Sequence, residues 1–485
     1  MYIGVDLGTS GVKLLLMDRS GKILNKVTRT YPISFPHPGW SEQDPLDWYG
    51  ETLEGIRDLI SDIDPKEIRG IGIAGQMHGL VMLDEHDEVI RPAILWNDGR
   101  TDKETDFLNN EIGTGRLAGL TGNIAFAGFT APKILWIRNN EPDNFKNISR
   151  IMLPKDYLVY RLTGAFTSDY SDASGMLLMD VKNKCWSDGM LEICGITKDM
   201  LPELKDSFDV SGTVKADIAA ELGLANDVKV VAGAGDNAAA AIGTGTVGEG
   251  RCNISLGTSG TIFVSGRNYA ELNNNALHSF AHADGGYHIM GCMLSAASCN
   301  KWWMEDILND KDFKQIQDNM TDLGNNNVFF LPYLMGERSP HNDPKVRSMF
   351  IGMSMDTSRV SMTQAVLEGV AYGMRDCLEV AREMDINITE TTMCGGGAKS
   401  RVWRTIMANV LNIRVKTLVN DEGPALGGAI LAAVGDNVFE DVISASQKIV
   451  EFGEVIEPDK EISERYDKGY EFYKKLYPSV KGLYA

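Results

Sequence analysis

The hydrophobic positions near the start of the chain fall into short runs separated by turns, which predicts a meander of strands. Two such runs flank the phrase Leu7-Gly8-Thr9-Ser10-Gly11, a pattern typical of a strand, a tight turn and a second strand. Residues 22–28 form a third run. The same five letters return at 256–260, again between apolar runs. We therefore expect the second half of the chain to repeat the opening meander.

Other segments have the spacing of amphipathic helices. Asp44 and Pro45 are typical of an N-cap and a first-turn proline. The positions that follow recur at helical intervals and predict a buried face formed by Leu46, Tyr49, Leu53, Ile56 and Ile60. A second, longer helix is expected from about 357 to 384.

The two repeated turns have the composition of phosphate-binding loops. Glycines let a backbone approach a ligand closely, and exposed N–H groups with Thr and Ser hydroxyls can cradle an anion. Each copy taken alone could be an ordinary hairpin turn with no ligand. The same five residues in each half, however, favour a duplicated domain with a ligand bound between the two copies. Asp6 precedes the first copy and Ser255 the second. Only the first copy therefore offers a carboxylate for a metal ion beside the phosphates.

A small apolar strand at 71–75 runs into the polar sequence Gln76-Met77-His78-Gly79. The ends of such strands are where open α/β sheets place ligands. His78 is either a structural histidine or a ligand contact, and its position beside two glycines favours the contact. Met77 taken alone would be a core residue.

A second strand of this kind, at 228–232, ends in a glycine turn followed by Asp236-Asn237 and an alanine-rich helix. Asp236 is either a helix N-cap or a carboxylate held next to a substrate by small neighbours. The two repeated turns favour the second interpretation, a catalytic base. Near the other end of the chain, the glycines at 395–397 would let a ring or a ribose approach the backbone, although the segment lacks the spacing of a P-loop.

Composition narrows the class of protein. A chain of 485 residues is long enough for two domains with separate cores. The net charge of -20 argues against nucleic acid or an anionic membrane as a partner. The seven cysteines form no CxxC pair, and no basic leader or membrane-spanning apolar run stands out. We expect a cytoplasmic protein with reduced thiols, and a domain boundary at 245/246 in a glycine-rich junction.

Together these motifs resemble the FGGY carbohydrate kinases. The resemblance is carried by both LGTSG turns, GFTAPKILW at 128–136, GDNAAAA at 235–241 and GGGAKS at 395–400. It implies an α/β fold of two duplicated, actin-like (ribonuclease H-like) domains, at 1–245 and 246–485, with a catalytic cleft between them. Further phrases, such as GIAGQMHG and PYLMGERSPHNDP, are most similar to the bacterial members that act on D-xylulose. The resemblance then implies MgATP-dependent phosphorylation of the C5 hydroxyl of D-xylulose by a homodimer.

The resemblance also assigns roles by position. Asp236 matches the catalytic base, Met77, His78 and Asn237 match sugar contacts, and Asp6 matches the residue near Mg²⁺. The ATP contacts that it implies are Thr9 and Lys13 in the first phosphate motif, Gly257, Thr258 and Ser259 in the second, and Gly396, Gly397 and Ala398 in the adenosine motif.

Two alternatives stay open at this point. One is a related kinase of ribulose, L-xylulose, gluconate or glycerol, although Met77-His78 and Asn237 depart from the Arg-Glu pair and the glutamine of glycerol kinases. The other is an actin-like nucleotide switch that binds protein partners, which would need the phosphate turns but neither a sugar pocket nor a base.

Overall fold

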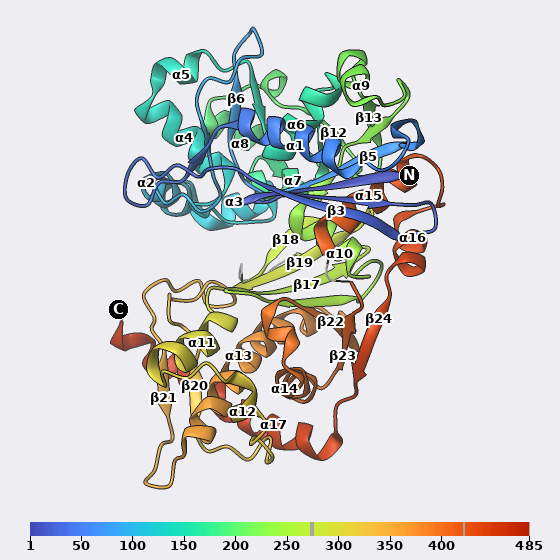
Figure 1. The fold of residues 1–485 in the computed structure, drawn as a ribbon. Helices are drawn as coiled ribbons and strands as arrows, with labels where there is room; N and C mark the ends of the chain where they lie inside the picture. Colours follow the sequence, from blue (N-terminus) through green and yellow to red (C-terminus); the bar gives the residue numbers. More distant parts are fainter. Residues whose placement is uncertain (272–275, 421, 485) are drawn as a thin grey trace.

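The computed structural model describes residues 1–271, 276–420 and 422–484, and it contains two large mixed sheets (Figure 1). The first sheet has the strand order β13-β14-β5-β1-β2-β3, with β15 also paired to β5. Its strands are β1 (Tyr2–Leu7), β2 (Gly11–Met17), β3 (Ile23–Thr30), β5 (Gly70–Gly75), β13 (Val210–Thr213), β14 (Lys229–Val231) and β15 (Ala234–Gly235).

The second sheet has the order β18-β19-β17-β16-β22-β23-β24. Its strands are β16 (Cys252–Leu256), β17 (Gly260–Gly266), β18 (His278–Ala281), β19 (Tyr287–Met293), β22 (Glu390–Cys394), β23 (Arg414–Leu418) and β24 (Phe452–Ile456).

The two sheets repeat one arrangement. The hairpin of β1 and β2 closes with Leu7 opposite Val12, and the hairpin of β16 and β17 closes with Leu256 opposite Gly260. In each copy the first hairpin strand also runs parallel to a later strand, β5 in one and β22 in the other. The prediction that the second half repeats the opening meander is therefore confirmed for the hairpin. The next strand differs, because β17 pairs with β19, and β18 lies on the far side of β19.

Helix α1 (Pro45–Leu59) begins where the sequence predicts, with the Asp44 side chain accepting a hydrogen bond from the Leu46 backbone N–H. Its predicted buried face is wrong at one position, because Leu46 is 51% exposed while Trp48 is fully buried. The Trp48 indole N–H donates to Gln43 Oε1 at 3.1 Å, so the large ring enters the core with its polar atom satisfied. That placement turns Leu46 towards solvent.

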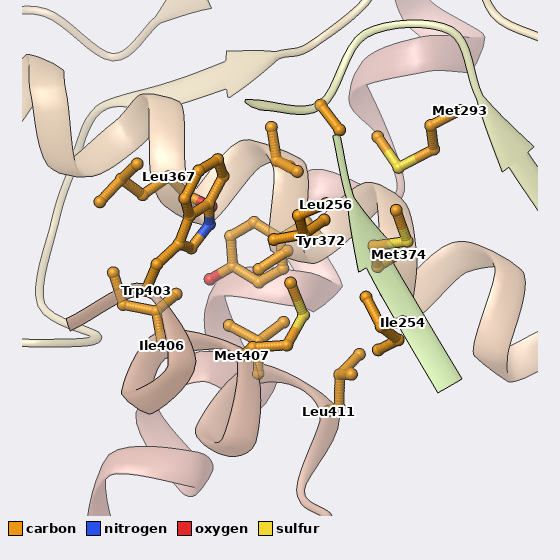
Figure 2. Packing of buried hydrophobic residues seen from close by; sticks show 14 of the residues in the cluster. Ile254, Leu256, Met293, Leu367, Tyr372, Met374, Trp403, Ile406, Met407 and Leu411 are labelled. Carbon is orange, nitrogen blue, oxygen red and sulfur yellow. The ribbon is translucent and has the colours of Figure 1, made fainter. Parts of the chain in front are cut away.

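The core of the second half lies between its sheet and two helices, α13 (Arg359–Arg382) and α14 (Arg401–Leu411). Helix α13 is the long helix expected at 357–384. Figure 2 shows Ile254 and Leu256 of β16 packed among side chains of both helices, including Leu367, Met374, Trp403, Ile406 and Met407. The Trp403 indole N–H donates to the Leu367 backbone oxygen at 3.0 Å, which ties α14 to α13 directly under β16.

Helix α15 (Gly423–Gly435) comes late in the chain yet packs against β1, β5 and α10 (Asp236–Gly243) of the first half. In Figure 1 it lies beside the blue strands although its own colour is near the red end of the scale. The boundary at 245/246 stays a prediction. Within the described residues, no helix combines the length and the apolar character needed to cross a membrane.

Candidate active site

Two carboxylates meet where parallel strands of the first sheet end. Asp6 on β1 lies opposite Ala74 of β5, and Ala234 of β15 lies on the other side of Ala74. Adjacent strands are about 4.8 Å apart, so Asp6 and Ala234 are separated by two such spacings. Asp236 follows Ala234 by two residues and is the first residue of α10. The fold therefore brings Asp6 and Asp236 to one edge.

Burial and mutual repulsion change the acidity of this pair. Burial, and then the charge of Asp6, raise the pKa of Asp236 to about 7 against the opposing hydrogen bonds from Asn237. Burial also raises the pKa of Asp6 to about 6; Glu422 adds to the rise, and the ammonium of Lys13 opposes it. Lys13 lies directly opposite Asp6 in the hairpin, so both side chains project from the same face of the sheet.

The first repeated turn is held by side chains from other segments. Thr9 Oγ1 donates to Gln76 Oε1 at 3.2 Å and accepts the indole N–H of Trp96 at 2.9 Å. Gln43 Nε2 donates to the Thr9 backbone oxygen at 2.7 Å. Because these bonds fix the turn before any ligand arrives, its N–H groups need little reorganisation to bind an anion.

The predicted sugar contacts lie next to the carboxylates. Asn237 Nδ2 donates to Asp236 Oδ1 at 3.0 Å and lies 3.8 Å from the sulfur of Met77. Met77 and His78 follow directly after β5. The structure thus brings Met77 into contact with Asn237, which is bonded to Asp236, from segments 160 residues apart in the chain, and His78 is the next residue after Met77.

His78 is held as a neutral hydrogen-bond acceptor. Its Nδ1 lies 2.8 Å from the backbone oxygen of Gly175, and a carbonyl oxygen can only accept, so Nδ1 carries the proton. Burial, followed by the charge of Lys133, lowers the pKa of His78 to about 3. Nε2 therefore carries no proton and can accept a hydrogen bond from a hydroxyl.

Sequence reasoning missed a buried charge cluster behind Asp236. Lys155 Nζ lies within ion-pair distance of three buried carboxylates, those of Asp156, Asp169 and Asp172, at 2.6, 2.9 and 3.9 Å. Ser171 Oγ donates to Asp169 Oδ2 at 2.5 Å and accepts the N–H of Gly235 at 3.2 Å. The cluster fixes the backbone just before Asp236. Its signals in the sequence are the polar run at 168–175 and the adjacent pair Lys155-Asp156, and neither shows that the two segments meet.

In the second half, a cavity of about 770 Å³ opens beside the second repeated turn and the glycine turn at 395–397. Of the six predicted ATP contacts in this half, Gly257, Thr258, Gly396 and Gly397 line it, while Ser259 and Ala398 do not; Thr9 and Lys13 of the first half do not line it either. Ser259 is exposed on the turn, and Ala398 is buried beneath the glycines. The volume suits a ligand of nucleoside size.

Family models match both halves of the chain. The description "FGGY family of carbohydrate kinases, N-terminal domain" matches residues 1–243, and the C-terminal domain of the same family matches residues 252–435. The chain belongs to the FGGY family of carbohydrate kinases. The predictions of this family, of a carbohydrate kinase and of a duplicated actin-like α/β fold are thereby confirmed.

Within the FGGY family, the chain is 39% identical to the xylulose kinase of Escherichia coli (strain K12) over 489 aligned residues, which cover 100% of both proteins. The crystal structure of a xyloylose kinase from Brucella ovis matches with a TM-score of 0.95 at 39% identity, covering 99% of each chain. A gluconate kinase from Lactobacillus acidophilus matches with a TM-score of 0.94 at 26% identity, over 100% of this chain and 98% of that one. Kinases named for different sugars thus share this fold. The fold alone does not identify the sugar, which must be argued from the side chains of the site.

Proposed function

We propose that this protein phosphorylates D-xylulose at its C5 hydroxyl with ATP, and that Asp236 is the general base. The observation that carries the proposal is the contact of the Asn237 amide with both Asp236 and Met77, because it joins the base to the sugar contacts. The full-length similarity to a xylulose kinase supports the choice of sugar.

The division of work between side chains follows from their positions. Asp236 accepts the proton of the attacking hydroxyl, and its raised pKa matches that task near neutral pH. His78 Nε2 accepts a hydrogen bond from a second sugar hydroxyl, and Asn237 orients the Asp236 carboxylate. The N–H groups of the two repeated turns, with Thr9, Thr258 and Ser259, bind the phosphates, and Lys13 adds positive charge. Gly396 and Gly397 lie against the adenosine, and Ala398 supports them from below without lining the cavity.

The carboxylates fit a Mg²⁺ ion that arrives with ATP. The described residues contain no group of three or more acidic, histidine or cysteine side chains suited to a metal, but Mg²⁺ in phosphoryl-transfer sites usually takes only one or two carboxylates and completes its shell with phosphates and water. Asp6 and Asp236 repel each other across a buried edge, and a divalent cation relieves such repulsion. When bound beside Asp6, the ion neutralises charge on the transferring phosphates.

Asp6→Asn should raise the Mg²⁺ concentration that gives half-maximal turnover and lower kcat by about tenfold or more, because the amide keeps the shape of the side chain and loses its charge. A magnesium titration at saturating ATP and sugar measures both effects. Asp62→Asn, an exposed change after α1, is the matched control. An unchanged magnesium curve for Asp6→Asn would remove this residue from the metal site.

The pH profile has a predicted direction. Asp236 must be unprotonated to act as a base, and its pKa is raised to about 7. We therefore expect kcat/KM for the sugar to be half-maximal at about pH 7, to reach its plateau above about pH 8, and to fall about tenfold per pH unit well below pH 7. The charge of Asp6 is one cause of the rise, so the acid limb of the remaining activity in Asp6→Asn should move to lower pH. An acid limb that stays in place would argue against this coupling.

The proposed function is tested by a coupled ADP-release assay on a panel of ketopentoses, gluconate and glycerol. A preference for D-xylulose by kcat/KM is the expected result. Turnover of another sugar in the panel would keep the kinase and replace the substrate. ATP hydrolysis that requires a protein partner and whose rate no sugar changes would favour a nucleotide switch instead. A homodimer and a cytoplasmic location stay predictions.

A further inference from the structure

Lys133 is a buried lysine whose ammonium bonds two backbone carbonyls. It lies in α4 (Thr130–Asn140) with no exposed surface. Its Nζ donates to the His78 oxygen at 2.7 Å and to the Gly128 oxygen at 2.8 Å. Among the described residues, no carboxylate lies within ion-pair distance of it. Burial lowers the pKa of Lys133 well below its usual value, and the charge of Asp98, which is itself bonded to Arg100, opposes this only in part. Burying an ammonium in this way is costly, which points to a role beyond packing.

The first carbonyl belongs to a strained residue. His78 has φ of 69°, in the left-handed region that side chains other than glycine rarely adopt. Thr130 Oγ1 donates to the same His78 oxygen at 3.1 Å. Two donors from the first turn of α4 therefore converge on one carbonyl, and they hold a conformation that the backbone of His78 would not favour by itself.

The second carbonyl belongs to the segment that packs on the His78 ring. Gly128 precedes Phe129, whose ring centroid lies 4.7 Å from that of His78. Gly128 also approaches the backbone closely, since a Cβ there would lie 2.5 Å from the Trp96 oxygen. One ammonium therefore joins the two segments that carry the His78–Phe129 ring pair.

We propose that Lys133 is a positioning residue of the sugar site, which fixes His78 and Phe129 relative to each other and so sets the discrimination between ketopentose stereoisomers. The inference rests on the proposed function, because it takes the bare Nε2 of His78 as a sugar contact. A hydroxyl of the wrong configuration leaves this acceptor without a partner once the sugar covers it, and this is how a polar pocket rejects a close analogue. The discrimination between ketopentose stereoisomers therefore depends on how rigidly the His78 ring is fixed.

The central test is Lys133→Met, which keeps the length of the side chain and removes its three donors. We expect KM for D-xylulose to rise about tenfold or more, the usual effect of losing a hydrogen bond to a charged group. The ratio of kcat/KM for D-xylulose to that for D-ribulose should fall by a similar factor, while KM for ATP and sugar-free ATP hydrolysis stay unchanged. Lys133→Gln keeps amide donors and should lie between wild type and Lys133→Met.

Two further variants separate positioning from loss of folding. Thr130→Val removes the neutral donor to the His78 oxygen and leaves the ammonium in place, so a smaller change in the same ratio is expected. Lys146→Met on the neighbouring helix α5 (Pro142–Lys146) has an exposed side chain and should change nothing. If Lys133→Met does not fold, judged by a thermal melt, the result for Thr130→Val decides.

The outcomes distinguish the inference from the proposed function. The role of Lys133 is overturned if a folded Lys133→Met protein keeps the wild-type ratio of kcat/KM for D-xylulose to that for D-ribulose. If Lys133→Met does not fold, an unchanged ratio in Thr130→Val overturns it. A wild-type protein that fails to phosphorylate D-xylulose instead overturns the proposed function, whatever the variants do. A lower ratio with unchanged KM for ATP supports both.

Discussion

The Asp236→Asn protein is expected to lose about 100-fold or more in kcat for the sugar, with little change in KM for ATP. Asparagine keeps the size of the side chain and its hydrogen bond to the Asn237 N–H, which Asp236 Oδ1 accepts at 2.7 Å in the wild type, but it cannot take the hydroxyl proton. Coupled ADP release at saturating D-xylulose measures the loss, and Asp236→Ala should behave alike.

Stability separates this interpretation from a helix-terminal role. Asp236 is the first residue of α10, and an acid there stabilises a helix by about 0.3–1 kcal/mol. Burial, however, raises its pKa, so above pH 7 the folded state holds a charged carboxylate that folding disfavours. We therefore expect Asp236→Asn to melt at the same temperature as the wild type or higher. Asp188→Asn, an exposed acid in the first turn of α8 (Asp188–Cys194), is the control. If the Asp236→Asn protein kept full turnover and melted at a lower temperature, Asp236 would have only a stabilising role at the helix terminus.

The parts of the site that the sequence predicts are those set by local chain order. A tight turn between two apolar runs specifies a hairpin within about ten residues, so both repeated turns could be located before the structure was known. Asp236 was found in the same way, as the polar residue after a strand and a glycine turn. Local chain order does not show that Asp236 lies close to Asp6. That closeness becomes predictable once both residues are placed at the ends of parallel strands in one sheet.

The side chains that support the site could not be predicted. Lys133 bonds carbonyls 55 and 5 residues away, and no periodicity marks a lysine that donates to backbone. Lys155 lies beside three carboxylates. Asp156 is its neighbour in α6 (Pro154–Thr163), but Asp169 and Asp172 reach it only because β9 (Thr167–Asp169) and α7 (Tyr170–Ala173) pack beside α6. The wrong prediction that Leu46 is buried also comes from tertiary packing. Trp48 is buried in its place because its ring fits the core and its indole N–H bonds Gln43.

Gly427→Ala is expected to destabilise the protein by about 1–3 kcal/mol and to lower kcat at the same time. A Cβ at Gly427 of α15 would lie 2.0 Å from the backbone oxygen of Ala239 in α10. Backbone atoms cannot turn aside as a flexible side chain can, so the two helices must separate. Alanine otherwise favours a helix by about 1 kcal/mol over glycine, and the expected loss is the amount by which the clash exceeds that gain.

The effect on turnover follows from what α10 carries. Asp236 is its first residue, and a shift of the base by about 1 Å can cost on the order of 100-fold in rate. Gly119→Ala is the matched control, since this glycine also lies in a helix, α3 (Thr114–Thr121), and no atom lies within 4 Å of the added Cβ. It should be neutral or slightly stabilising, with normal kcat. Chemical denaturation and steady-state kinetics on both proteins measure the two effects. A Gly427→Ala protein with wild-type stability and kcat would show that α10 and α15 can separate without moving the base. The close packing of α15 on α10 would then have no part in holding Asp236.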